Sequence, residues 1–307
     1  MLCQGESGNA NWGAMSGLKG LSQDSRTWDL RSWGWRALMA GSIAAVALPV
    51  SASAADMESR FKAPPSAYDL TITVGVEGKV EPIFQGSKDF TVRPNPLFDF
   101  RRYGTPERFR APRDGIGFGL FEGSNFQIGP VGQIRIGRRE SDDRTALHGL
   151  GNVPWAGEIG AFAEYWFMPW LRARAEVRQG VTGHHGLVAD LTADAVVPVT
   201  RQLTLSGGPR ATLVTAAANR PYFSIDDIQS AASGLPVFSA GGGLRSVGAG
   251  AQARYFWTPQ IATHVFVEYD RLTGDVADSP LVTQRGSPNQ VTIGFGITRS
   301  FDIKQPW

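Results

Sequence analysis

The sequence predicts an all-β fold: an antiparallel transmembrane β-barrel of the outer-membrane type with about twelve strands. Two observations support this prediction. Apolar and polar residues alternate from Leu70 to Phe301 in runs of about ten residues, which is the length of a membrane-crossing strand. An apolar segment at 37–48, of the kind that directs export, precedes these runs. Together they favour a protein that is exported and then enters a membrane as strands.

The N-terminal region has the parts of an export signal. Arg31 and Arg36 precede the apolar core Ala37–Leu48, and small residues at 51–55 fit a cleavage site. This core is too short to span a bilayer as a helix, which needs about 20 residues. We therefore expect a signal peptide with an unusually long N-region. The predicted organisation is a signal peptide at 1–55 that is removed, a periplasmic leader at 56–69, the barrel at 70–301 and a C-terminal tail at 302–307.

Composition argues against several classes of protein. The formal net charge is only +2 over 307 residues, which gives no electrostatic reason to expect nucleic acid as a partner. Cys3 is the one cysteine and lies in the predicted signal peptide, so the mature chain has no disulfide and no thiol nucleophile. The loop histidines His148 and His184 do not have metal-site spacing. We predict no catalytic residue, no metal site, no cofactor and no enzymatic activity.

The strands are predicted in order from the alternation. The segments are 70–80, 90–101, 108–121, 126–138, 156–167, 171–180, 187–197, 203–213, 244–257, 261–272 and 289–301. Single-chain bacterial barrels have even numbers of strands, and these segments are eleven. The pattern is weakest in 102–121, which holds Pro106, Pro112 and Gly115, and 214–243 is the other place for an error. Twelve strands is the prediction, and ten is the alternative.

The segment 171–180 indicates which face points inward. Its residues alternate between an apolar face of Leu171, Ala173, Ala175 and Val177 and a charged face of Arg172, Arg174, Glu176 and Arg178. An arginine on the lipid side at the bilayer midplane costs about 2–4 kcal/mol, so the charged face is expected to face the lumen. There we expect a cross-strand salt-bridge network that mostly fills the barrel. Its predicted members are Arg135, Glu158, Glu164, Arg172, Arg174, Glu176, Arg178, Asp190, Asp194, Arg254, Glu268 and Asp270.

The connections alternate between short and long. Short turns are expected at Glu122–Asn125, Met168–Trp170, Pro198–Gln202 and Thr258–Gln260, and longer loops at 139–155, 181–186, 214–243 and 273–288. Outer-membrane barrels have short periplasmic turns and longer outside loops, which assigns these two sets to the two sides. The loop 214–243 is too apolar to be freely solvated, so it either plugs the barrel mouth or offers a binding surface. Its candidate residues are Tyr222, Phe223, Leu235 and Phe238.

Several separated motifs resemble one family. They are Tyr222–Ile225, Gln229–Pro236, Arg178–Asp190 and Leu272–Pro280, and they occur in the order found in the MipA/OmpV family. Two features depart from that family: His185 stands where members often carry Asp, and the chain continues past Phe301, which aligns with the usual terminal aromatic residue. The resemblance extends from about Tyr68 to Phe301.

The resemblance implies an outer-membrane protein named for its interaction with a lytic transglycosylase. The implied role is a non-enzymatic scaffold that docks this murein hydrolase together with a bifunctional penicillin-binding protein. Its expected surroundings are the lipid of the bacterial outer membrane, these two periplasmic enzymes and, during biogenesis, the barrel-assembly machinery. Other members are known as antigens or adhesins, so a surface adhesin is one alternative function. The charged residues expected in the lumen make a small-solute channel the other alternative.

Overall fold

The computed structural model describes residues 70–105 and 107–304. The predicted signal peptide, the periplasmic leader and the last three residues of the tail lie outside the described residues. In the described part of the chain, no helix is both long enough and apolar enough to cross a membrane.

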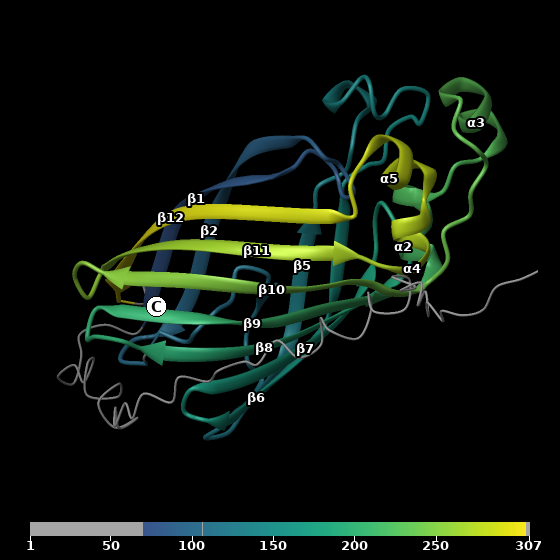
Figure 1. Ribbon diagram of the computed structural model, residues 1–307. Helices are drawn as coiled ribbons and strands as arrows, with labels where there is room; N and C mark the ends of the chain where they lie inside the picture. The colour runs from purple at the N-terminus through teal and green to yellow at the C-terminus, as the bar shows by residue number, and fades with distance from the viewer. Residues whose placement is uncertain (1–69, 106, 305–307) are drawn as a thin grey trace, which may run out of the picture. The chain divides into compact units, whose positions relative to one another are not determined.

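Twelve strands form one curled antiparallel sheet (Figure 1). They are β1 (Leu70–Pro82), β2 (Phe90–Arg102), β3 (Ile116–Gly117), β4 (Phe121–Glu122), β5 (Phe126–Arg135), β6 (Ala156–Met168), β7 (Leu171–Gly180), β8 (Leu187–Pro198), β9 (Leu203–Val214), β10 (Gly243–Phe256), β11 (Ile261–Leu272) and β12 (Asn289–Ile303). The order is β2-β1-β12-β11-β10-β9-β8-β7-β6-β5-β3, and β4 also pairs with β5. The predicted fold class and the count of twelve strands are confirmed.

The first and last long strands lie side by side, as in a barrel. β1 pairs with β12 from Leu70 opposite Ile303 to Val80 opposite Ile293. From β12 back to β5, every strand pairs with the strand that precedes it in the sequence. The sheet is therefore a continuous meander in which each hairpin fixes the register of the next strand.

The predicted strand at 108–121 is wrong. Only β3 and β4, of two residues each, are extended and paired in this region. Before them the chain closes a turn, because the Asp114 carboxylate accepts the Ala111 N–H at 2.9 Å and the Asp114 N–H donates to the Ala111 carbonyl at 3.0 Å. Pro112, which has no N–H to give to a sheet, lies inside that turn. The two short strands take the place of the single long one and bring the count to twelve.

The two faces of the long strands differ as their alternation predicts. On β7, Val177 is 50% exposed on the outer face, whereas its neighbour Arg178 is 1% exposed on the inner face. Large apolar side chains cover the outer face on other strands too, including Phe98, Ile159 and Phe295. The outer surface is therefore suited to lipid, and the charged side chains point into the lumen.

Short turns and long connections gather at opposite ends of the strands (Figure 1). The long connections contain the short helices η2 (Glu140–Asp142), α2 (Ala216–Phe223), α3 (Asp227–Ser233), α4 (Gly274–Asp278) and α5 (Pro280–Arg285). A capping box begins α3, where Asp226 accepts from the Gln229 N–H at 2.8 Å and the Gln229 side chain accepts from the Asp226 N–H at 3.1 Å. Gly234 ends this helix at φ 75°, which a glycine adopts without steric cost.

Candidate functional site

The centre of the lumen is a group of ion pairs on β6, β7 and β8, which we call the lumen network. Arg172 is fully buried and reaches three carboxylates: its Nη2 lies 2.6 Å from Asp114 and 2.8 Å from Glu164, and its Nη1 lies 3.2 Å from Asp194. The strand registers produce these contacts, because Arg172 lies opposite Asp194 on β8. Facing charges of opposite sign stabilise such cross-strand pairs.

Toward the end of the strands that carries the long connections, Glu158 contacts three basic side chains of the same network. Its carboxylate is 3.0 Å from Arg135 Nε, 3.0 Å from Arg178 Nε and 3.0 Å from His184 Nε2. Arg178 also pairs with Glu176 and Asp190. Every charged group of this cluster therefore has at least one partner of opposite sign, which offsets the cost of burying it.

A second set of ion pairs lies on the inner face of β9, β10 and β11. Arg210 Nη2 lies 2.6 Å from Asp194, and its Nε lies 3.7 Å from Glu268. Arg254 pairs with Glu107, in the segment that follows β2. The structure brings all the predicted lumen charges into ion pairs: Arg135, Glu158, Glu164, Arg172, Arg174, Glu176, Arg178, Asp190, Asp194, Arg254, Glu268 and Asp270.

The inward segment, residues 110–115, was not anticipated as part of this network. Arg113 pairs with Asp270 on β11, while the neighbouring Asp114 pairs with Arg172 on β7. The Gly115 N–H donates to Glu176 Oε1 at 3.1 Å. Because β7 and β11 are not neighbours in the sheet, this segment connects two separate parts of the wall through the interior. The sequence signal was the break in alternation at Pro112 and Gly115.

The inward segment also bridges the two edges of the sheet. Arg110 Nη2 lies 3.5 Å from Asp99 on β2 and 3.5 Å from the Gly117 carbonyl on β3. β2 and β3 are the two ends of the strand order. A side chain therefore links the edges at a place where no ladder pairing between them occurs in the described residues.

A histidine spans three strands near the short-turn end. His264 on β11 has its Nε2 2.6 Å from Glu77 on β1, across β12. The ring crosses β12 at Gly296, where an added Cβ would come within 2.4 Å of His264 Cε1. Glycine is required there because any side chain would occupy the space of the ring. Glu77 is a lumen residue that the alternation alone did not single out.

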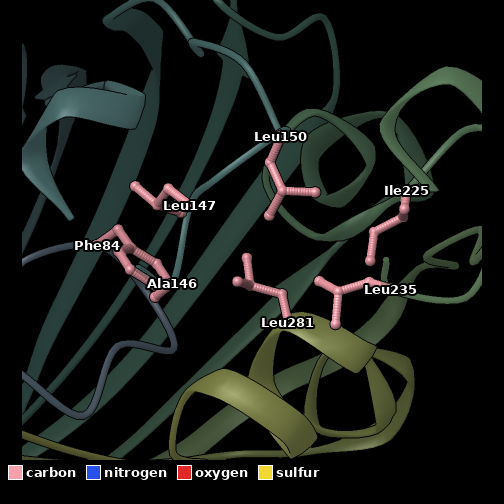
Figure 2. Packing of buried hydrophobic residues seen from close by; sticks show 7 residues of the cluster. All are labelled: Phe84, Ala146, Leu147, Leu150, Ile225, Leu235 and Leu281. Carbon is pink, nitrogen blue, oxygen red and sulfur yellow. The ribbon is translucent and has the colours of Figure 1, made fainter. Parts of the chain in front are cut away.

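The long connections form a compact layer, which we call the cap: residues 83–89, 136–155, 215–242 and 273–288. One apolar cluster joins all four, with Phe84, Ala146, Leu147, Leu150, Ile225, Leu235 and Leu281 buried together (Figure 2). A second contains Val153, Tyr222, Phe223, Ala240, Leu272, Val276 and Val282, and Phe238 packs against both. The four candidate loop residues Tyr222, Phe223, Leu235 and Phe238 therefore pack inside the cap instead of projecting into solvent.

Two arginines inside the cap donate hydrogen bonds that hold its connections together. Arg285 donates through Nη1 to the carbonyls of Ala146 at 3.1 Å and His148 at 3.3 Å, and through Nη2 to the Ser233 carbonyl. Arg138 donates through Nη1 to the Tyr222 carbonyl at 2.8 Å. Burial lowers the pKa of Arg138 to about 10, because a charged guanidinium is poorly solvated at this place.

The histidines do not converge on one site. His184 is buried against Glu158, whereas the side chain of His148 is 70% exposed and lies 3.5 Å from Glu140. His185, where the chain departs from the family pattern, is exposed. Within residues 70–105 and 107–304, no group of three or more His, Cys, Asp or Glu side chains is arranged to hold a metal ion.

Comparison with known proteins gives a family. The family model described as "MltA-interacting protein MipA" matches residues 74–301, which is most of the chain. The chain belongs to this family. This MipA family member is an outer-membrane β-barrel protein. The family, the curled antiparallel sheet and its apolar outer face together support this conclusion. The family that the motifs predicted is confirmed.

Other comparisons give only distant similarity. Among curated proteins, none matches the chain. A solved structure described as a KdgM porin is 10% identical, covers 75% of this chain and 99% of its own, and has a TM-score of 0.38. A NanC porin is 7% identical over 75% of this chain and 98% of its own, with a TM-score of 0.36. Neisserial surface protein A is 8% identical over 77% and 98%, with a TM-score of 0.24.

Proposed function

We propose that this MipA family member is a non-enzymatic outer-membrane scaffold that docks murein-remodelling enzymes: a lytic transglycosylase together with a bifunctional penicillin-binding protein. The observation that carries the proposal is the occupied lumen. The inward segment is paired to β7 through Asp114 and to β11 through Arg113, so side chains cross the interior. A barrel closed in this way acts through its surfaces. The name of the family supports a transglycosylase of the MltA type as the partner.

The docking surface that we propose is the short-turn end. We assign this end to the periplasm, with the turns at 169–170, 199–202 and 257–260, the start of β1 at Leu70 and the end of β12 at Ile303. Exposed aromatic side chains gather beside the turns, including Trp170 and Trp257. Such residues mark the membrane interface in outer-membrane barrels. The turns between them are then accessible to periplasmic enzymes.

Co-purification of the full-length barrel with a lytic transglycosylase of the MltA type tests this proposal. We expect retention that is lost when the turns at 199–202 and 257–260 are replaced by Gly-Ser sequences. Ile228→Ser, at an exposed position of α3 on the opposite end, is the matched control and should leave retention unchanged. Absence of retention at every ionic strength would contradict the scaffold function. Retention that responds to Ile228→Ser but not to the turns would contradict the assigned docking surface.

A small-solute channel is the second candidate, because many polar side chains line the interior. Planar-bilayer recording of the refolded barrel separates the two functions. We expect a silent barrel, since the inward segment and the cap both obstruct the lumen. Steady conductance that increases when Asp114 is replaced by Ala would favour the channel over the scaffold.

A surface adhesin is the third candidate, and the exposed apolar residues of the cap are the observation that favours it. Ile228 is 81% exposed and Val237 is 57% exposed. An adhesin would lose surface binding in the double variant Ile228→Ser, Val237→Ser while the barrel stays folded. We expect no such loss.

A further inference from the structure

A β-bulge at the start of β10 turns one arginine into the lumen. The register of β10 on β9 shifts between Leu244 and Ser246, so Arg245 is the extra residue. Counting back from Val247, which is 39% exposed on the outer face, strict alternation would place Arg245 on the same side. Instead Arg245 is 5% exposed and Ser246 is 3% exposed, and both are buried. Bulges of this kind re-aim side chains and occur often beside functional sites.

The side chain of Arg245 has no partner in the described part of the chain. Its Nε is buried and donates to no acceptor. Glu158 and Asp190 lie within electrostatic range of Arg245, as do the cations Arg135 and Arg113. Both of those carboxylates already have other partners among the described residues. An arginine remains charged in proteins, so a buried guanidinium without a counter-ion requires an explanation.

The partners of the two nearby carboxylates are fixed by short contacts. Glu158 accepts from Arg135 at 3.0 Å, from Arg178 at 3.0 Å and from His184 at 3.0 Å. Asp190 accepts from Arg178 and from the Thr212 hydroxyl at 2.5 Å. Arg245 is thus a buried cation that has no carboxylate partner among the described residues after these pairs have formed.

Two further buried donors beneath the cap lack acceptors. Tyr222 Oη and Arg138 Nε form no hydrogen bond with any described residue. The Tyr222 ring lies 6.2 Å from the His184 ring of the lumen network, and Arg138 Nη1 donates to the Tyr222 carbonyl at 2.8 Å. Tyr222 therefore lies where the cap meets the lumen network, and Arg245 is within electrostatic range of it. Unsatisfied buried polar groups are few in native proteins, and a collection of donors around one place points to an acceptor that is not part of the chain. The acceptor that suits guanidinium donors is an oxyanion, which an arginine binds through two parallel hydrogen bonds.

We propose that Arg245, together with Tyr222, forms an oxyanion site between the cap and the lumen network. Its ligand is a small molecule with a phosphate, sulfate or carboxylate group. The bulge at Arg245 supplies the unpaired charge, the phenol of Tyr222 supplies a neutral donor, and the cap covers both. This site goes beyond the scaffold function and does not depend on it.

Titration of the intact barrel with simple oxyanions tests the proposal. Protein refolded in chloride buffer is titrated with sodium phosphate, sodium sulfate or sodium acetate at constant ionic strength, and binding heat is measured. We expect saturable binding of at least one probe. Phosphate or sulfate without acetate identifies a tetrahedral oxyanion, and acetate identifies a carboxylate. Loss of one charged hydrogen-bond donor should weaken binding by about tenfold or more in Arg245→Gln.

The control variant is Arg220→Gln, because Arg220 is an exposed arginine on α2 in the same cap. It should bind the probe like the unmodified protein. Saturable binding that is equal in Arg245→Gln and the unmodified protein would overturn the proposal, as would the absence of saturable binding for all three probes. If Arg245→Gln fails to fold, as judged by heat-modifiable migration, Tyr222→Phe replaces it and should weaken binding.

Phosphorus NMR of the unmodified protein tests the site without any variant. Exchange broadening of the inorganic phosphate signal supports the site. An unchanged phosphate line at every concentration, with no sulfate or acetate binding, rejects it.

Discussion

Arg172 in the lumen network and Phe223 in the cap are both fully buried, yet their surroundings are opposite in kind. Arg172 touches three carboxylates from the inward segment, β6 and β8. Phe223 packs among apolar side chains from the connections that form the cap. The first environment depends on partners of opposite charge in fixed directions, and the second on the removal of apolar area from water.

One chain fills the two parts of its interior by different means. In the lumen, strand register sets which charges face each other, so the ion pairs fix the positions of the strands and of the inward segment. In the cap, no sheet register holds the four connections together. They are held by apolar packing, as in the buried cluster that contains Leu147, Ile225 and Leu281 (Figure 2). We therefore expect damage in the lumen to weaken the whole barrel, and damage in the cap to remain local.

The largest effect is expected for Arg172→Met. The change leaves Asp114, Glu164 and Asp194 with one cation fewer in a buried place, and breaking such a pair costs about 3–5 kcal/mol. The free energy of unfolding should fall by that amount in urea titrations of the barrel in lipid vesicles, followed by tryptophan fluorescence.

The control for Arg172→Met is Arg201→Met, at an exposed position in the turn between β8 and β9. It should change the free energy of unfolding by less than about 0.5 kcal/mol. Equal effects of the two changes would contradict the view that the ion pairs of Arg172 hold the barrel together.

The next effect is expected for Phe223→Ala. Truncating a buried phenylalanine costs about 3–5 kcal/mol, and we expect the lower end because the cluster lies in connections that can partly collapse. The cap should become sensitive to trypsin while the strands stay folded and the barrel keeps its heat-modifiable migration. Ile228→Ala removes an apolar side chain that is 81% exposed and should not increase cleavage. Cooperative loss of the whole barrel in Phe223→Ala would show that cap and strands are one folding unit.

A smaller effect is expected for Gly234→Ala, at the end of α3. Space is not limiting, since nothing lies within 4 Å of an added Cβ, but φ is 75° there. A residue with a side chain is disfavoured in this conformation, at a cost of about 1 kcal/mol. Trypsin sensitivity of the cap should rise moderately. Gly234→Asn tests the cause, because asparagine tolerates this conformation better and should lose less. A greater loss for Asn than for Ala would mean that φ is not the cause.

The regular part of the lumen network could be predicted because period-two alternation is a local property. Arg172, Arg174 and Arg178 alternate with apolar residues, and the cost of an arginine in lipid decides which face they share. Their partners Asp190 and Asp194 follow from the same alternation on the next strand. The order of residues and the cost of an arginine in lipid are enough to predict this part of the network.

Arg113, Asp114 and Arg245 could not be predicted in the same way. The first two lie in a turn whose position depends on carboxylates and cations from distant strands. Arg245 points into the lumen because of a β-bulge, and strict alternation of apolar and polar residues does not predict bulges. A signal was present nonetheless, because an arginine two residues before Val247 stands where alternation expects an apolar residue. The cap was foreseen as an apolar loop, but its clusters join residues as distant as Phe84 and Leu281.

The smallest effect is expected for Tyr222→Phe, and it appears only at alkaline pH. In chloride buffer near neutral pH, the loss of a hydroxyl that has no hydrogen-bond partner should change the free energy of unfolding by less than about 0.5 kcal/mol. Burial raises the pKa of Tyr222 above its ordinary value of 10.0. The folded protein therefore holds the phenol proton more tightly than the unfolded chain does, so this contribution is complete below pH 10 and is lost as the pH rises through the raised pKa. Unfolding in urea at several pH values should show a shallower decline above pH 10 for Tyr222→Phe. Identical pH profiles for the two proteins would mean that Tyr222 is as accessible to water in the cap as in the unfolded chain, and would argue against a buried phenol beneath the cap.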